Sequence, residues 1–262
     1  MEFKLLGPVE IKEGKISCTP RAPKVKQVLA LLLLRANQVV SIDSLIEELW
    51  GDSPPRSAVT TAQTYIYQLR QIMAGAADGE SGRIETTPPG YLLRVDDGEL
   101  DVHNFAVLVG RAQRCDEAAE FRPAGQYAQK ALALWRGRAM ADVTLGNLLG
   151  GYAVNLEERR IGVLELRVAA EMRLGNYREI IADLRSLVAA HPLNEWFHAQ
   201  LITALSEVGR RSDALQAYRT VRELLRTELG LEPSAQLREV HRAILTADLR
   251  PSAPRRMDPL IA

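Results

Sequence analysis

Hydrophobic residues spaced three and four positions apart predict two helices near the start of the chain. The first covers residues 24–36, which combine apolar residues with strong helix formers and stop before Asn37. The second covers residues 42–50, with Ser41 as its candidate N-cap and Gly51 at its end. Its apolar positions recur at helical spacing: Ile42, Leu45, Ile46 and Leu49.

A third amphipathic helix is predicted after Pro54-Pro55, with Ser57 as its candidate N-cap. Its apolar face is expected to hold Val59, Ala62, Ile66, Leu69 and Met73. Its opposite face carries side chains that form hydrogen bonds and bring no negative charge: Thr60, Thr61, Gln63, Thr64, Tyr67, Gln68, Arg70 and Gln71. Such a face is suited to the edges of nucleic-acid bases.

Segments with strand-like composition flank these helices. Residues 3–11 and 15–19, separated by Glu13-Gly14, predict an opening hairpin. Residues 83–95 predict two short strands that turn at Pro88-Pro89-Gly90. A hairpin that follows a third helix is typical of the wing of a winged helix-turn-helix domain.

Beyond Asp101 the strand-like runs disappear and helical patterns continue to about Leu249. We therefore expect a winged-helix domain over 1–97, a helical domain over 101–249 and a flexible tail over 250–262. The fold class is mainly α with a small β component.

The helical part contains a repeat. An offset of 34 residues, the tetratricopeptide period, pairs Gly175 with Gly209 and Leu184 with Tyr218. A weaker earlier copy is obtained when Gly125 is set against Gly175. Three stacked helical hairpins are therefore predicted, and such stacks form a concave groove that binds proteins.

The charge balance argues against a protein that binds DNA through its net charge, because the chain has 33 basic and 33 acidic residues. The exception is local: Ser53–Ala77 contains no Asp or Glu but includes Arg56 and Arg70. The longest apolar run, Val28–Leu34, is much shorter than the roughly 20 residues of a membrane span. No export signal is recognisable and Cys18 and Cys115 lie far apart, so we expect a cytoplasmic protein.

Enzymatic activity is not expected. The chain contains no G-x-x-x-x-G-K phosphate loop, no G-x-S-x-G nucleophile motif and no H-E-x-x-H zinc motif. Its four histidines are scattered, so neither a metal nor a cofactor is predicted. One alternative to DNA binding stays open, namely a tetratricopeptide-type adaptor whose winged domain binds protein.

Seven segments together resemble the Streptomyces antibiotic regulatory protein family over nearly the whole chain. They are FKLLGPVEI, KQVLALLLLRANQVVS, LIEELWGDSPP, TAQTYIYQLRQ, TPPGYLLRV, ALALWRG and TELGLEPSAQL. The resemblance implies an OmpR-type winged helix-turn-helix followed by a bacterial transcriptional activator domain of tetratricopeptide-like helices. It further implies a transcriptional activator of antibiotic or secondary-metabolite genes. Its partners would be direct repeats of promoter DNA, bound as a dimer, and the RNA polymerase holoenzyme.

The resemblance also assigns roles along the third helix and the wing. Thr60 and Thr61 would meet phosphates, while Arg70 would meet a base or the backbone. The residues expected to face bases are Thr64, Tyr67 and Gln68. The remaining candidate DNA contacts are Arg56, Ser57, Gln71 and, in the wing, Thr87. Relatives often carry more arginine on this helix and a basic residue in the wing where this chain has Thr87, so modest affinity of a single copy is expected.

Overall fold

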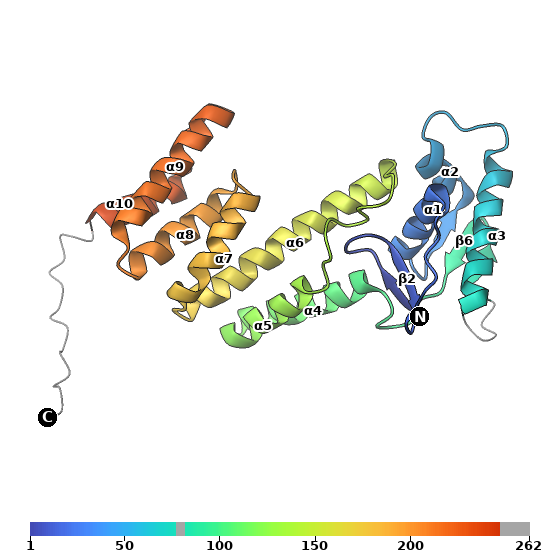
Figure 1. Cartoon of the computed structure of the whole chain (residues 1–262), viewed down its shortest axis with the longest axis horizontal. Coiled ribbons are helices and arrows are strands. Elements are labelled where there is room, and N and C mark those ends of the chain that lie inside the picture. Colours follow the sequence, from blue (N-terminus) through green and yellow to red (C-terminus); the bar gives the residue numbers. More distant parts are fainter. Residues whose placement is uncertain (77–81, 247–262) are drawn as a thin grey trace, which may run out of the picture. The chain divides into compact units, whose positions relative to one another are not determined.

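The computed structural model describes residues 1–76 and 82–246, so the tail predicted over 250–262 lies outside the described residues (Figure 1). The chain divides into two compact units, Met1–Arg167 and the part from Val168 onward. The first unit contains the whole predicted winged-helix domain together with the first helices of the following domain. Within the described residues no helix is both long and apolar enough to cross a membrane.

The first unit opens with a three-stranded antiparallel sheet in the order β1-β2-β3. Its strands are β1 (Glu2–Lys4), β2 (Glu10–Glu13) and β3 (Ile16–Ser17). The single strand predicted over 3–11 is therefore wrong, because the chain leaves the sheet between β1 and β2.

Contacts with distant residues explain this break. The backbone N–H groups of Leu5 and Leu6 donate to the carboxylate of Asp101, at 2.8 to 2.9 Å. The Leu6 carbonyl accepts a hydrogen bond from the Arg136 N–H at 2.7 Å. Gly7 has a φ of +144°, and a Cβ there would lie 2.9 Å from the Cβ of Arg136. These partners replace a neighbouring strand, and none of them is near in sequence.

Three helices follow: α1 (Pro23–Leu34), α2 (Ile42–Trp50) and α3 (Ala58–Ala76). The bounds of α2 match the prediction. Ser41 caps α2, because its hydroxyl oxygen accepts a hydrogen bond from the Ser44 N–H at 3.0 Å.

The wing belongs to a second antiparallel sheet in the order β4-β6-β5. The predicted hairpin is confirmed as β5 (Ile84–Thr87) and β6 (Gly90–Leu93), whereas β4 (Val39–Ser41) was not predicted. A Cβ on Gly90 would lie 1.9 Å from the carbonyl oxygen of Val40 in β4. Only glycine therefore lets the two strands approach at this point.

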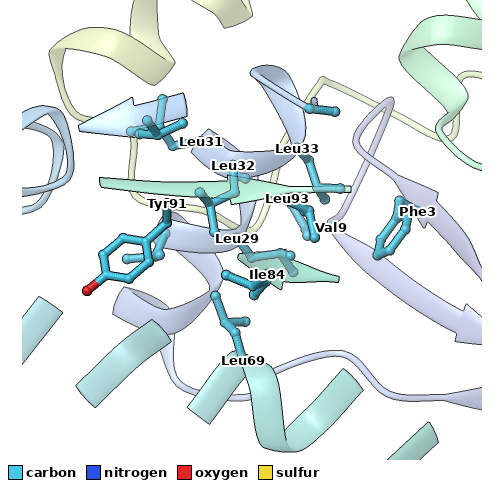
Figure 2. Close-up of a cluster of buried hydrophobic side chains, with 14 of the residues drawn as sticks. Phe3, Val9, Leu29, Leu31, Leu32, Leu33, Leu69, Ile84, Tyr91 and Leu93 are labelled. Carbon is cyan, nitrogen blue, oxygen red and sulfur yellow. The ribbon is translucent and has the colours of Figure 1, made fainter. Parts of the chain in front are cut away.

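One hydrophobic core joins these helices and sheets. Helix α1 is buried on almost every side, which explains its unbroken apolar run. Figure 2 shows Leu29, Leu32 and Leu33 among side chains from the strands and from α3, including Leu69 and Leu93. This packing fixes α3 and the wing on one framework.

The first unit continues with α4 (Asp101–Glu117), α5 (Phe121–Leu132) and α6 (Asn147–Arg173), of which α6 extends into the second unit. These helices share a separate core that includes Phe105 and Trp135. The two rings meet edge to face, with centroids 5.6 Å apart. This cluster therefore relies more on aromatic residues and alanines than the leucine-rich core of the winged helix does.

The second unit contains α7 (Tyr177–Ala190), α8 (Glu195–Glu207), α9 (Arg211–Leu229) and α10 (Ala235–Thr246). Helix α8 packs against both α7 and α9, and α10 packs on α8 and α9 (Figure 1). Stacked antiparallel helices of this kind are the architecture predicted from the repeat.

The same three-residue turn joins α4 to α5, α6 to α7 and α8 to α9. Its middle residue has a positive φ in each case: 57° at Ala119, 77° at Gly175 and 79° at Gly209. All three turns also share one pattern of backbone hydrogen bonds. The pairing of Gly175 with Gly209 is confirmed, but the pairing of Gly125 with Gly175 is wrong. Gly125 lies inside α5, and Ala119 is the equivalent residue.

Candidate nucleic-acid interface

Helix α3 has one face in the core and one face exposed. Ala58, Ala62, Ile66, Leu69 and Met73 are all buried. Val59, which the sequence analysis assigned to the buried face, is 47% exposed, and that assignment is wrong. Ala58 lies four residues before Ala62, so both are on the same face of the helix and the buried stripe begins at Ala58. Val59, one residue further on, therefore points away from the core.

The exposed face of α3 carries the polar side chains predicted to meet bases. The exposed residues on this face are Val59, Thr60, Gln63, Thr64, Tyr67, Gln68 and Gln71. Tyr67 is 61% exposed although it is a large aromatic residue. The Thr64 hydroxyl donates to the Thr60 carbonyl at 2.9 Å, so its oxygen is left to accept a hydrogen bond from a ligand. This face therefore offers several donors and acceptors without a carboxylate.

The residues before and in the first turn of α3 differ in their availability. Arg56 and Ser57 are exposed, and the Ser57 carbonyl accepts a hydrogen bond from the Thr61 N–H at 2.9 Å. Thr61 is only half-buried, and its hydroxyl lies 3.4 Å from that of Ser57. Arg56 takes part in no hydrogen bond or ion pair within the described part of the chain. Of the two arginines at positions 56 and 70, Arg56 is therefore the one that is free to bind a phosphate.

Arg70 is engaged with the wing. Its Nε donates to the Ile84 carbonyl at 3.0 Å and its Nη2 donates to the Thr86 hydroxyl at 2.8 Å. The guanidinium also lies 5.8 Å from the centre of the Tyr91 ring. Arg70 therefore ties α3 to β5 and β6, and this role was not expected from the sequence.

The tip of the wing is uncharged. Thr86, Pro88 and Pro89 are exposed, whereas Thr87, the predicted wing contact, is half-buried. Nearer the base of the hairpin, Arg94 donates to the carboxylate of Glu85 at 2.9 and 3.2 Å. This hydrogen bond holds the pKa of Glu85 below its usual range. The ion pair cancels the local charge, so the wing presents mainly hydroxyl and apolar groups.

The geometry brings most of the predicted contacts together. Thr60, Thr64, Tyr67, Gln68 and Gln71 share one exposed face. Three further exposed residues lie beside them and are not among the predicted contacts: Val59, Gln63, which the sequence placed on the same face, and Thr86. The spacing of Gln63 from Thr60 and Tyr67 was a usable signal, whereas the exposure of Val59 depends on the phase of the helix. The role of each residue in binding DNA stays a prediction.

Within the described ranges, three or more His, Cys, Asp or Glu side chains are nowhere grouped so that they could hold a metal ion. The exposed face of α3 and the adjoining hairpin instead have the arrangement of a transcription factor of the winged helix-turn-helix class.

Comparison with known proteins agrees with this class. Residues 17–93 match the family model described as the C-terminal part of transcriptional regulatory proteins, and residues 100–245 match the bacterial transcriptional activator domain. The regulatory protein DnrI of Streptomyces peucetius is 42% identical over 95% of this chain and 93% of its own length. The transcriptional regulator RedD of Streptomyces coelicolor is 36% identical over 95% of this chain and 71% of its own length.

A solved structure supports the same assignment. Mycobacterium tuberculosis EmbR, in complex with a low-affinity phosphopeptide, superposes with a TM-score of 0.86 at 32% sequence identity. The match covers 93% of this chain and 64% of that one, so EmbR contains a further part without a counterpart here. The chain belongs to the Streptomyces antibiotic regulatory protein family, whose members are transcription regulators and not enzymes.

Proposed function

We propose that this protein is a sequence-specific transcriptional activator of antibiotic or other secondary-metabolite genes. The observation that carries the proposal is the exposed, carboxylate-free face of α3 from Thr60 to Gln71. A hydrogen-bonding face without negative charge fits the major groove, where each base pair offers a distinct set of donors and acceptors. The assignment of antibiotic or other secondary-metabolite genes as targets is supported by the family resemblance.

In this proposal α3 enters the major groove and the hairpin of β5 and β6 reaches the adjacent minor groove. Two copies bind direct repeats as a dimer, with half-sites on one face of the duplex about 10 base pairs apart. Paired binding offsets the weak electrostatic attraction expected where Arg56 is the free cation beside α3.

The two parts of the chain divide the work. Residues 1–97 contact the promoter, and residues 101–249 contact RNA polymerase holoenzyme and recruit it. A protein acting in this way operates at the nucleoid, in the cytoplasm. The stacked helices suit this task because they present long protein-binding surfaces.

Footprinting on promoters of the neighbouring genes tests the proposal. Protection of two directly repeated half-sites is expected. Gln68→Ala is expected to weaken operator binding by about 1 to 3 kcal/mol, with a much smaller effect on random DNA. Gln129→Ala, on the exposed face of α5, is the matched control and should bind like the parent. A protein with no sequence preference at any salt concentration would instead be an adaptor.

Activation requires its own measurement. Transcription reconstituted from purified holoenzyme and a promoter with the footprinted repeats should rise when the protein is added. Changing the spacing of the repeats by half a helical turn should abolish that rise, because the two copies would then lie on opposite faces of the duplex. A rise that does not depend on the spacing would contradict the paired arrangement.

A further inference from the structure

A hollow on the second unit has the chemistry of a binding site and lies apart from α3 and the wing. Its volume is about 500 Å³, and it lies between α7 and the turn that joins α8 to α9. Six residues line it: Arg178, Ile181, Ala182, Arg185, Val208 and Arg210. Three of the six are arginines, and none is acidic.

Two of these arginines are free to bind a ligand. Arg178 and Arg185 lie seven residues apart on α7, which places them on the same face, two turns from each other. Both are exposed, and within the described residues neither forms an ion pair or a hydrogen bond. Arg210 differs, because its Nε donates to the carboxylate of Asp213 at 2.7 Å. Arg178 and Arg185 therefore form an uncompensated positive pair.

The floor of the hollow is apolar. Ile181 is buried, Val208 is half-buried and Ala182 is an exposed methyl group between the arginines. The neighbouring hollow is polar and shares Arg178 with this one, but its lining also includes Glu179 and Glu207, which would repel an anion there. A negatively charged ligand with an apolar group is thus favoured on the side of Ile181 and Arg185.

We propose that this hollow binds an acidic segment of a partner protein. An apolar side chain of the segment packs on Ile181 and Val208, and its carboxylates meet Arg178 and Arg185. Charge complementarity selects this occupant, since guanidinium groups bind carboxylates with two parallel hydrogen bonds. The inference does not rest on the proposed DNA binding, because it needs neither DNA nor the face of α3.

Fluorescence anisotropy with the full chain tests the proposal. The probe is a short labelled peptide in which leucine alternates with glutamate, and the comparison peptides carry glutamine or lysine in place of glutamate. We expect the acidic peptide to bind at least about tenfold more tightly than either comparison peptide. Binding should weaken as salt is added, because the contacts are exposed ion pairs.

Charge reversal locates the site. Arg185→Glu should weaken binding of the acidic peptide about threefold, and the double change R178E with R185E at least about tenfold. Arg219→Glu is the matched control, since Arg219 is an exposed arginine of α9 outside the hollow, and it should leave binding unchanged. Arg178→Lys with Arg185→Lys keeps the charge but cannot form the two parallel hydrogen bonds, so it should lose less affinity than the charge reversal and still bind more weakly than the parent.

Three results would overturn the proposal. The first is equal affinity for the acidic and the glutamine peptides. The second is an unchanged affinity for the acidic peptide in the double variant, with circular dichroism confirming that both proteins are folded. The third is that the double variant loses affinity for a random DNA duplex but not for the peptide, which would assign Arg178 and Arg185 to the DNA backbone.

Discussion

The carboxylate of Glu48 in α2 accepts a hydrogen bond from the backbone N–H of Gly146, with 2.6 Å between Oε1 and the nitrogen. Its other oxygen accepts hydrogen bonds from the N–H groups of Leu148 and Leu149, both at 3.0 Å. Glu48 is 2% exposed, so a buried anion of the helix-turn-helix caps the N-terminus of α6. A Cβ on Gly146 would lie 2.3 Å from the Glu48 carbonyl oxygen, which shows how closely the two segments fit.

Glu48→Gln should therefore destabilise the first unit. An amide has one acceptor oxygen, so at least one of the three backbone N–H groups would be left without a partner inside the protein. The expected cost is about 1 to 3 kcal/mol in the free energy of unfolding, measured by urea titration. Glu47→Gln is the control, because Glu47 is the exposed neighbour, and it should change stability by less than about 0.5 kcal/mol. Equal stability of the two variants would show that the cap contributes little.

The contacts of Asp101 predict which N-terminal fragments of the chain are stably folded. It is 6% exposed, and its carboxylate holds the N–H groups of Leu5 and Leu6. A fragment that ends at Asp97 lacks this carboxylate, whereas a fragment that ends at Arg167 keeps it. We expect cooperative thermal unfolding for the longer fragment and a clearly lower melting temperature for the shorter one. Identical melting of the two fragments would mean that the β1-β2 connection holds its shape without Asp101.

The ion pair between Lys26 and Asp142 predicts that the stability of the folded protein depends on pH. Burial acts to raise the pKa of Asp142, but hydrogen bonds from Lys26 and from the Val9 N–H outweigh it and hold the pKa below the ordinary value of 3.8. A carboxyl group with a lowered folded-state pKa stabilises the protein above pH 3.8, and this contribution is lost as the pH falls through the lower folded-state value.

Asp142→Asn should consequently be less stable than the parent at neutral pH, by less than about 1 kcal/mol because the pair is partly exposed. The difference should shrink as the pH falls below 3.8. Asp52→Asn, at an exposed residue, is the control and should show no such convergence. Urea titrations across the acid range measure both variants. A difference that stays constant with pH would contradict the assignment.

Substitution of Arg70 is expected to lower DNA affinity indirectly, through the position of the wing. Arg70→Ala removes two hydrogen bonds between α3 and β5, so the wing should become more mobile and operator affinity should fall. The slope of log affinity against log salt should change by much less than one unit, because the guanidinium is engaged within the protein. A slope that changes by about one unit would show instead that Arg70 meets a phosphate in the complex.

For Arg56→Ala we expect the opposite effect on the salt dependence of DNA binding. It is exposed at the approach to α3, and it has no partner within the described residues. Arg56→Ala should weaken binding to operator and random DNA by similar factors and reduce the magnitude of the salt slope by about one unit. Arg21→Ala, at an exposed arginine before α1, is the comparison variant. A loss restricted to the operator would mean that Arg56 contacts a base.

Local patterns in the sequence were enough to predict the three helices and the wing of the winged-helix domain, but not β4 or the break between β1 and β2. Helix α2 follows from its apolar spacing and from Ser41, and the wing follows from the turn at Pro88-Pro89-Gly90. The exposed face of α3 was also predictable, apart from Val59, because hydrogen-bonding residues fill the other exposed positions from Thr60 to Gln71.

The contacts that the sequence did not reveal join distant residues. Nothing near Leu5 indicates that its N–H will meet Asp101, and nothing near Glu48 indicates that it will cap α6. The engagement of Arg70 depends on the distance between α3 and β5, which only the packed core determines. The sequence did not reveal the turn at Ala119, because the turn is defined by its backbone conformation and Ala119 lacks the glycine found at the equivalent positions 175 and 209.

The three equivalent turns at Ala119, Gly175 and Gly209 have a consequence for how the protein unfolds. In the second unit α7, α8 and α9 pack on their neighbours in the chain and α10 packs on α8 and α9, so the stability of a hairpin depends chiefly on the hairpins next to it. Loss of α10 would expose parts of α8 and α9. Denaturation of the whole chain should therefore proceed in more than one step, with the C-terminal hairpins able to open while the DNA-binding elements stay folded.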